Sequence, residues 1–164
     1  MIKYLDAIST WLNRLLVWVA GAFLVGMVFL ACANILCRIF WVPIQGTFEL
    51  MGYAGAVVTA FALGYTQINR GHISVDVLVE TFSRKRKRML VLINNVICLV
   101  FFGLAAWQLY VKADTLRVTG EVTETLRIVY YPFTYAVAFG CVILALVMFT
   151  DIIRQVVPPK EETH

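Results

Sequence analysis

Charged residues are absent from the long apolar stretches of this chain. No Asp, Glu, Lys or Arg occurs in four segments, which run from Leu15 to Leu36, from Leu50 to Ile68, from Met89 to Val111 and from Phe133 to Thr150. A carrier that moves a charged solute unaided normally places ionisable or other polar groups near the middle of its membrane spans. Their absence argues against transport by this chain alone and favours a scaffold or accessory membrane subunit.

Histidines and metal-binding cysteine patterns are scarce as well. The two histidines, His72 and His164, lie outside the apolar stretches, which excludes a haem held between two histidines of the spans. The cysteines show no Cys-x-x-Cys spacing and have no histidine nearby; they are Cys32, Cys37, Cys98 and Cys141. Phosphate-binding loops and nucleophile elbows are also missing. The sequence therefore predicts no enzyme, no catalytic residue, no cofactor and no metal site.

Apolar residues dominate what is present. Of the 164 residues, 61% are hydrophobic and 15% are charged, whereas a soluble domain has about 25% charged residues. A helix needs about 20 apolar residues to cross a hydrocarbon core, and four segments qualify: 15–39, 48–68, 89–111 and 133–154. They lack the alternating polarity of barrel strands. The sequence predicts an all-α polytopic membrane protein with one four-helix domain over residues 1–157 and a disordered tail over 158–164.

Lysine and arginine are distributed unevenly between the two sides of this four-span arrangement. One side holds Lys3, Arg14, Arg70, the run Arg84, Lys85, Arg86, Lys87 and Arg88, then Arg154 and Lys160, whereas the other holds Arg38, Lys112, Arg117 and Arg127. Because cytoplasmic loops carry the basic excess, both termini and the central loop are predicted to be cytoplasmic. The run of five basic residues is predicted to attract anionic lipid headgroups, at about 1 kcal/mol per residue. No nucleic-acid-binding motif accompanies the net charge of +4, so nucleic acid is not a predicted partner.

Two amphipathic segments are predicted beside the spans. Residues 1–14 have apolar positions at helical spacing, which is typical of a short helix at the membrane surface. In segment 73–83, apolar residues form one helical stripe and Asp76 and Glu80 form another, which predicts a second such helix on the cytoplasmic side. His72 and Asp76 are interpreted as a cap of the cytoplasmic hairpin rather than as a proton relay.

Small residues recur every four positions in the second span. Gly52, Ala56, Ala60 and Gly64 fall on one helix face, where small side chains let another helix approach closely. We interpret this ridge as a packing surface within the chain rather than as an interface between subunits.

Few polar residues lie in or beside the spans. Arg38 and Glu49 flank the turn that contains Pro43, and we expect them to pair at the membrane surface, with contact to a charged substrate or an external partner as the alternative. Amides within the spans include Asn34, Asn94, Asn95 and Gln108. Amides in membrane helices commonly hydrogen-bond to neighbouring helices, and we favour this over a polar path through the chain.

Four motifs in this order resemble the small membrane subunit of tripartite ATP-independent periplasmic (TRAP) transporters. They are Asn34-x-x-x-Arg38 at the end of the first span, Gly46-Thr47-Phe48-Glu49-Leu50 at the start of the second, Gly71-His72-Ile73-Ser74-Val75-Asp76 before the basic run, and Glu124-Thr125-Leu126 before the fourth span. The resemblance covers essentially the whole chain. The chain departs from many relatives in having Ile128-Val129 where they have Ile-Pro.

The resemblance implies a role in a complex of the bacterial inner membrane. In this family a large multi-span subunit carries substrate and sodium, a soluble periplasmic protein delivers an organic acid, and the small subunit braces the large one. The resemblance places Arg38, Glu49 and the loop 112–131, with its Glu121 and Glu124, on the side where the binding protein docks. It places the segment from His72 to Asp76 on the cytoplasmic side.

Two other functions remain as alternatives at this point. A small exporter acting as a dimer would use the ridge from Gly52 to Gly64 as its interface and Glu49 as its coupling residue. A membrane anchor of a redox complex would instead be recognised by a visible absorption spectrum.

Overall fold

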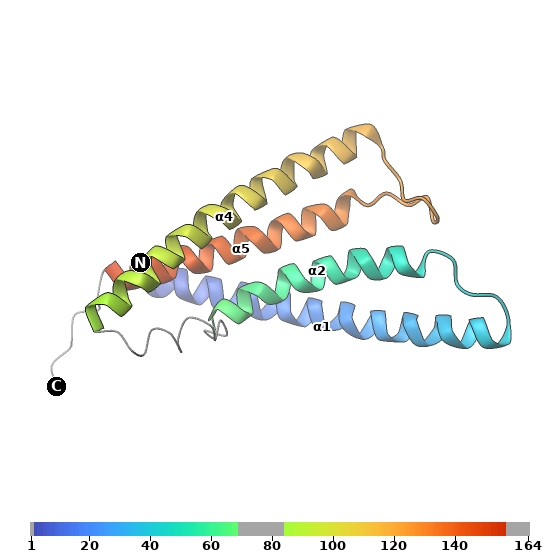
Figure 1. Cartoon of the computed structure of the whole chain (residues 1–164), viewed down its shortest axis with the longest axis horizontal. Coiled ribbons are helices and arrows are strands. Elements are labelled where there is room, and N and C mark those ends of the chain that lie inside the picture. Colours follow the sequence, from blue (N-terminus) through green and yellow to red (C-terminus); the bar gives the residue numbers. More distant parts are fainter. Residues whose placement is uncertain (1, 69–83, 157–164) are drawn as a thin grey trace.

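Four long helices make up the described part of the protein, which a computed structural model defines for residues 2–68 and 84–156 (Figure 1). The helices are α1 (Ile2–Phe40), α2 (Thr47–Ile68), α4 (Arg84–Thr119) and α5 (Tyr131–Val156). Each contains a segment long and apolar enough to cross a membrane; these segments are Ser9–Phe40, Thr47–Ile68, Met89–Thr119 and Tyr131–Ile153. The prediction of an all-α, four-span membrane protein is confirmed.

Helix α1 is continuous, so residues 2–14 do not form the separate surface helix that the sequence suggested. It has 39 residues, and a rise of 1.5 Å per residue gives a length of about 58 Å, well beyond the hydrocarbon core. One buried face crosses the expected boundary without a break, because Ser9, Asn13, Leu16 and Ala20 are all buried at helical spacing. Helix α4 likewise runs past the predicted end of its span to Thr119.

The helices pack as two hairpins joined through α5. Helix α5 lies against α4, α2 and α1, while α1 also packs along α2. Figure 1 shows α4 and α5 running side by side above the α1–α2 pair. A cluster of apolar side chains fills the junction of α1, α2 and α5; it comprises Leu16, Ala20, Val57, Ala60, Phe61 and Ile143. Because α5 has three neighbours, it has the most buried membrane segment of the four.

The small-residue ridge of α2 is divided between two environments. Ala60 and Gly64 are buried, whereas Gly52 and Ala56 are exposed. A Cβ added to Gly140 of α5 would lie 3.0 Å from the backbone and Cβ of Ala60, so the two helices are in direct contact there. Gly64 faces the side chain of Asn13 in α1. The half of the ridge that lies deeper in α2 therefore packs inside the chain, and the half near its N-terminus faces outward.

Several sequence predictions fall outside the described residues. They are the amphipathic helix 73–83, the cap formed by His72 and Asp76, and the tail 158–164. The run Arg84 to Arg88 forms the start of helix α4.

Candidate functional site

The two connections between paired helices lie at the same end of the bundle, which we call the loop end (Figure 1). One connection is the turn between α1 and α2, residues 41–46, and the other is the loop between α4 and α5, residues 120–130. Three of the four motifs noted in the sequence meet here. The loop end therefore brings together residues from three motifs, one of which is far from the other two in the sequence.

Polar side chains from both helices fix the turn between α1 and α2. The side-chain oxygen of Asn34 accepts a hydrogen bond from the backbone N–H of Ile44 at 2.9 Å. The Thr47 hydroxyl donates to the carbonyl of Ile44 at 2.8 Å, and Thr47 is only 2% exposed. Gly46 has φ of 73°, a left-handed conformation that favours glycine. The Asn34 side chain thus hydrogen-bonds to the turn of its own hairpin and not to a distant helix.

The loop between α4 and α5 is a tight hairpin. Its two arms are joined by an antiparallel bridge between Val122 and Val129. The backbone N–H of Thr123 donates to the carbonyl of Ile128 at 2.9 Å, and the N–H of Arg127 donates to the carbonyl of Thr123 at 3.1 Å. Arg127 has φ of 52°, which is uncommon for a residue with a side chain. These internal bonds give the loop a defined shape.

Glu49, in the first turn of α2, holds the tip of that hairpin. Its Oε1 accepts a hydrogen bond from the backbone N–H of Thr125 at 2.8 Å, and its Oε2 accepts one from Leu126 at 3.3 Å. The Leu126 side chain rests directly on Gly46, so a Cβ at Gly46 would overlap it. A carboxylate that accepts bonds from two successive amides is well suited to fix a turn. We call this set of contacts between Glu49, Gly46, Thr125 and Leu126 the loop clamp.

The ion pair expected between Arg38 and Glu49 is not formed. Both residues lie in the described part of the chain, where Arg38 is exposed and the Glu49 carboxylate binds the loop instead. The backbone amides of Thr125 and Leu126 are held in place by the hairpin, whereas a long arginine side chain would lose conformational freedom on pairing at the surface. The position of Glu49 at a helix end also leaves it far from the mid-membrane depth that a coupling residue of an exporter would occupy.

Stacked aromatic rings lie next to the loop clamp. Tyr53, one turn after Glu49 on α2, stacks on Tyr130 with ring centroids 5.4 Å apart and on Phe133 at 5.6 Å. The hydroxyl of Tyr130 donates to Glu121 at 2.7 Å. This hydrogen bond raises the pKa of Tyr130 above its usual value of 10.0, so the phenol remains protonated and able to donate at physiological pH. The start of α5 is thereby fixed to α2 beside the clamp.

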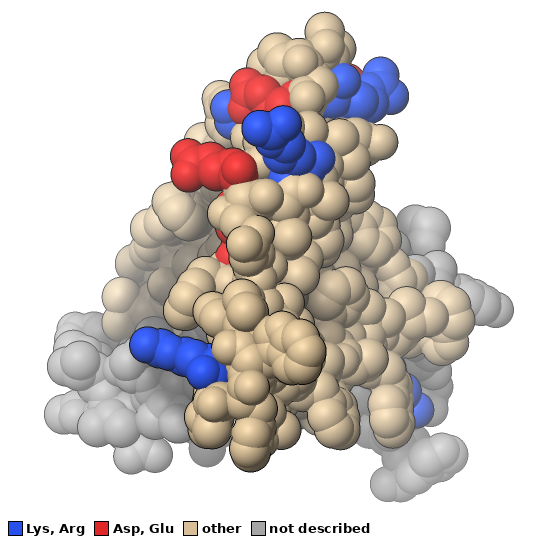
Figure 2. Space-filling model, turned by 90° about the vertical axis from the view of Figure 1, so that its right-hand side faces the viewer, with Lys and Arg blue, Asp and Glu red and all other residues tan. Residues whose placement is uncertain are grey.

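Acidic and basic side chains lie together at the loop end. Figure 2 looks onto this end and shows acidic and basic side chains gathered in its upper part, over the end of α4 and the loop that follows, with mostly uncharged surface below. Arg117 and Asp114 form an ion pair at 3.4 Å, and Glu121 and Glu124 are exposed. The site candidates of the sequence therefore separate into Glu49, whose carboxylate is hydrogen-bonded to the loop, and an exposed set that includes Arg38, Glu121 and Glu124.

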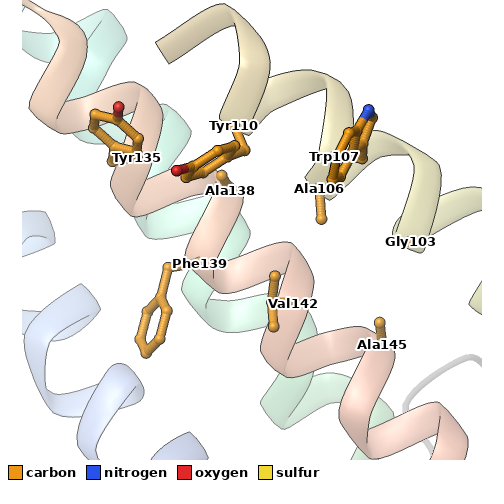
Figure 3. Close-up of a pocket in the computed structure, with 9 residues that line it drawn as sticks. All are labelled: Gly103, Ala106, Trp107, Tyr110, Tyr135, Ala138, Phe139, Val142 and Ala145. Carbon is orange, nitrogen blue, oxygen red and sulfur yellow. The ribbon is translucent and has the colours of Figure 1, made fainter. Parts of the chain in front are cut away.

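A groove of about 610 Å³ runs between α4 and α5 (Figure 3). Its nine lining residues are Gly103, Ala106, Trp107, Tyr110, Tyr135, Ala138, Phe139, Val142 and Ala145. None of them is charged, and the Tyr135 hydroxyl is engaged with Asp114 at 3.4 Å. Moving a carboxylate into such surroundings without a compensating group is strongly unfavourable. The groove is therefore not suited to hold an organic acid.

Metal binding finds no support in the described residues. Within ranges 2–68 and 84–156, no group of three or more His, Cys, Asp or Glu side chains is placed to hold a metal ion.

The sequence interpretation missed the pairing of Glu49 with the loop. Glu49 and Thr125 are 76 residues apart, so closeness along the chain favoured Arg38 instead. The available signal was that both residues lie in motifs of the same family, in Gly46-Thr47-Phe48-Glu49-Leu50 and in Glu124-Thr125-Leu126.

A family model described as "Tripartite ATP-independent periplasmic transporters, DctQ component" matches residues 27–157 of the chain. This range contains every residue of the loop clamp and all of α2, α4 and α5. No curated protein and no solved structure matches the chain significantly. The chain therefore belongs to the DctQ family and is the small, non-enzymatic inner-membrane subunit of a TRAP transporter, which works with a large permease subunit and a periplasmic binding protein.

Proposed function

We infer that this subunit braces the large permease subunit of a sodium-coupled carboxylate importer and does not itself contact the solute. The observation that carries this proposal is the absence of charged residues from the apolar core of all four spans. Sodium and an organic acid would each need compensating polar groups at membrane depth. The groove between α4 and α5 supplies none that is charged. The solute path therefore belongs to the partner.

The proposed orientation places the loop end in the periplasm. The basic excess lies beside the other end of the spans, including the run from Arg84 to Arg88 at the start of α4. The positive-inside rule then puts both termini in the cytoplasm. In the same orientation, this basic run faces the anionic headgroups of the cytoplasmic leaflet, to which we expect it to bind.

In that orientation the loop end forms part of the docking surface for the periplasmic binding protein. Arg38, Glu121 and Glu124 are exposed at this end, and exposed charges of both signs favour fast, salt-sensitive association. The loop clamp supports the same role, because a loop that is already ordered loses little conformational entropy when a partner binds.

Uptake by proteoliposomes tests the transport part of the proposal. Vesicles would contain this subunit with its large subunit, and purified binding protein loaded with a radiolabelled carboxylate would be added outside. We expect uptake only with an inward sodium gradient and with the binding protein present. Uptake that persists without sodium, or without the binding protein, would contradict the proposal.

Charge reversal in the loop tests the docking part. We expect Glu124→Lys to change the concentration of binding protein that gives half-maximal uptake by severalfold at low salt. The difference should shrink as salt is added, because exposed charges are then screened. The maximal rate at saturating binding protein should stay unchanged. An unaltered half-maximal concentration at low salt would remove the loop from the docking surface.

A further inference from the structure

One face of α4 contacts no other helix of the described part of the chain. On the side toward α5, helix α4 buries Asn95, Ala106, Ala113 and Leu116. The opposite side is exposed along the whole membrane segment; its residues, which we call the α4 free face, are Asn94, Ile97, Phe101, Leu104, Gln108, Val111 and Thr115. These positions alternate at spacings of three and four residues. Such a pattern forms a continuous seam on one side of a helix, as in helices that pack together along their length.

Two amide side chains on this face lie at hydrocarbon depth. Asn94 and Gln108 lie between Arg88 and Lys112, the charged residues that bracket the apolar part of α4. At 1.5 Å per residue this part is about 36 Å long, and both amides are within about 12 Å of its middle. A hydrocarbon core about 30 Å thick therefore includes both of them.

Neither amide finds a hydrogen-bond partner in ranges 2–68 and 84–156. Among the described residues, no hydrogen bond involves the side chain of Asn94 or Gln108. The exposed hydroxyls of Thr59 and Thr115 behave differently, because each donates to the carbonyl four residues earlier in its own helix. Lipid tails offer no hydrogen-bond partner, so an unpaired amide at this depth is unfavourable.

The exposed surface of α1 provides the contrast. Its exposed side chains in the middle of the span are apolar and include Phe23, Leu24, Val28 and Phe29. Lipid tails can cover such a surface without leaving a hydrogen-bonding group unpaired. The chain thus presents one long exposed face that suits lipid and one that calls for hydrogen-bonding groups.

We propose that the α4 free face packs along a membrane helix of the large permease subunit, with polar groups of that helix hydrogen-bonded to Asn94 and Gln108. This inference rests on the proposed bracing function and assigns its interface. Hydrogen bonds between membrane helices are individually modest, and the two amides lie about 21 Å apart on the same face. They therefore fix the register of a long contact whose remaining area is supplied by apolar packing.

Replacement of the two amides tests the contact. The double variant Asn94→Leu/Gln108→Leu would be co-expressed with the large subunit, and the large subunit retained on the tagged small subunit would be measured. We expect about tenfold less retention, from a few-fold for each hydrogen bond. Thr59→Val is the matched control, because it removes an exposed polar group whose bond is internal, and it should leave retention unchanged. Equal retention for both variants would overturn the proposal.

Photo-crosslinking locates the contact without disturbing it. A photoreactive residue would replace Phe101 on the α4 free face or, as the control, Phe29 on α1, in the intact complex. We expect an adduct with the large subunit from position 101 and lipid labelling from position 29. An adduct from position 29 alone would assign the interface to α1 and overturn the proposal while leaving the bracing function intact. An adduct joining two copies of this chain through position 101 would also overturn it. No adduct from either position, together with no retention of the large subunit, would contradict the bracing function itself.

Discussion

Two glycines with similar backbone conformations provide a sharp test of the loop clamp. Gly46 has φ of 73° and Gly120 has φ of 65°, so an alanine at either position must adopt a left-handed conformation that costs about 1–2 kcal/mol. The surroundings differ. A Cβ at Gly46 would overlap Leu126, whereas nothing lies within 4 Å of a Cβ at Gly120. Gly46→Ala thus adds an overpacking cost of about 1–3 kcal/mol that Gly120→Ala lacks.

The assay combines stability with loop release. For a chain of this size, about 1–3 kcal/mol corresponds to a melting temperature lower by about 2–12 °C, measured for the two variants in the same detergent. Trypsin cleavage after the exposed Arg127 should also be faster in Gly46→Ala, because cleavage follows local opening of the hairpin. Equal melting temperatures and equal cleavage rates for Gly46→Ala and Gly120→Ala would refute the contact between Leu126 and the turn.

Two further predictions follow from the contacts of α2. Ala60→Leu should destabilise the chain by about 1–3 kcal/mol, since Ala60 is closely packed on α5, whereas Ala56→Leu should change stability by less than about 0.5 kcal/mol. Thermal unfolding in detergent would compare the two variants. Equal losses of stability would mean that the two halves of the ridge do not differ in packing. Glu49→Ala should accelerate trypsin cleavage after Arg127, whereas Arg38→Ala should leave it unchanged and the double variant should match Glu49→Ala alone. A cleavage rate in the double variant that differs from that of Glu49→Ala alone would support the ion pair between Arg38 and Glu49 that the sequence suggested.

Hydropathy predicted the membrane helices because crossing a bilayer depends on the composition of each segment by itself. A segment that crosses a bilayer must be apolar over about 20 residues and must satisfy its own backbone. The same reasoning could not predict how far α1 extends toward its N-terminus. The buried face through Ser9 and Asn13 exists only because α1 has other helices beside it.

Packing partners depend on the arrangement of all the helices, which periodicity does not specify. The four-residue spacing from Gly52 to Gly64 identified a face that permits close approach, but only the half with Ala60 and Gly64 meets another helix. The central place of α5 follows from contacts with three helices. Its composition does not distinguish it from α1, since the two spans are equally apolar.

The loop clamp shows the same limit at the level of single residues. Asn34, Gly46 and Glu49 were recognised as parts of motifs, yet their partners, Ile44, Leu126 and Thr125, become evident only when the two connections are brought together.

Uptake with and without this subunit tests the central claim most directly. Labelled carboxylate would be delivered by the binding protein to proteoliposomes that contain the large subunit alone, this subunit alone, or both, with rates normalised to the amount of the large subunit. We predict uptake only when both are present, because the apolar cores of this subunit's spans contain no charged residue to bind the solute. Uptake by this subunit alone, or undiminished uptake by the large subunit alone, would contradict the account.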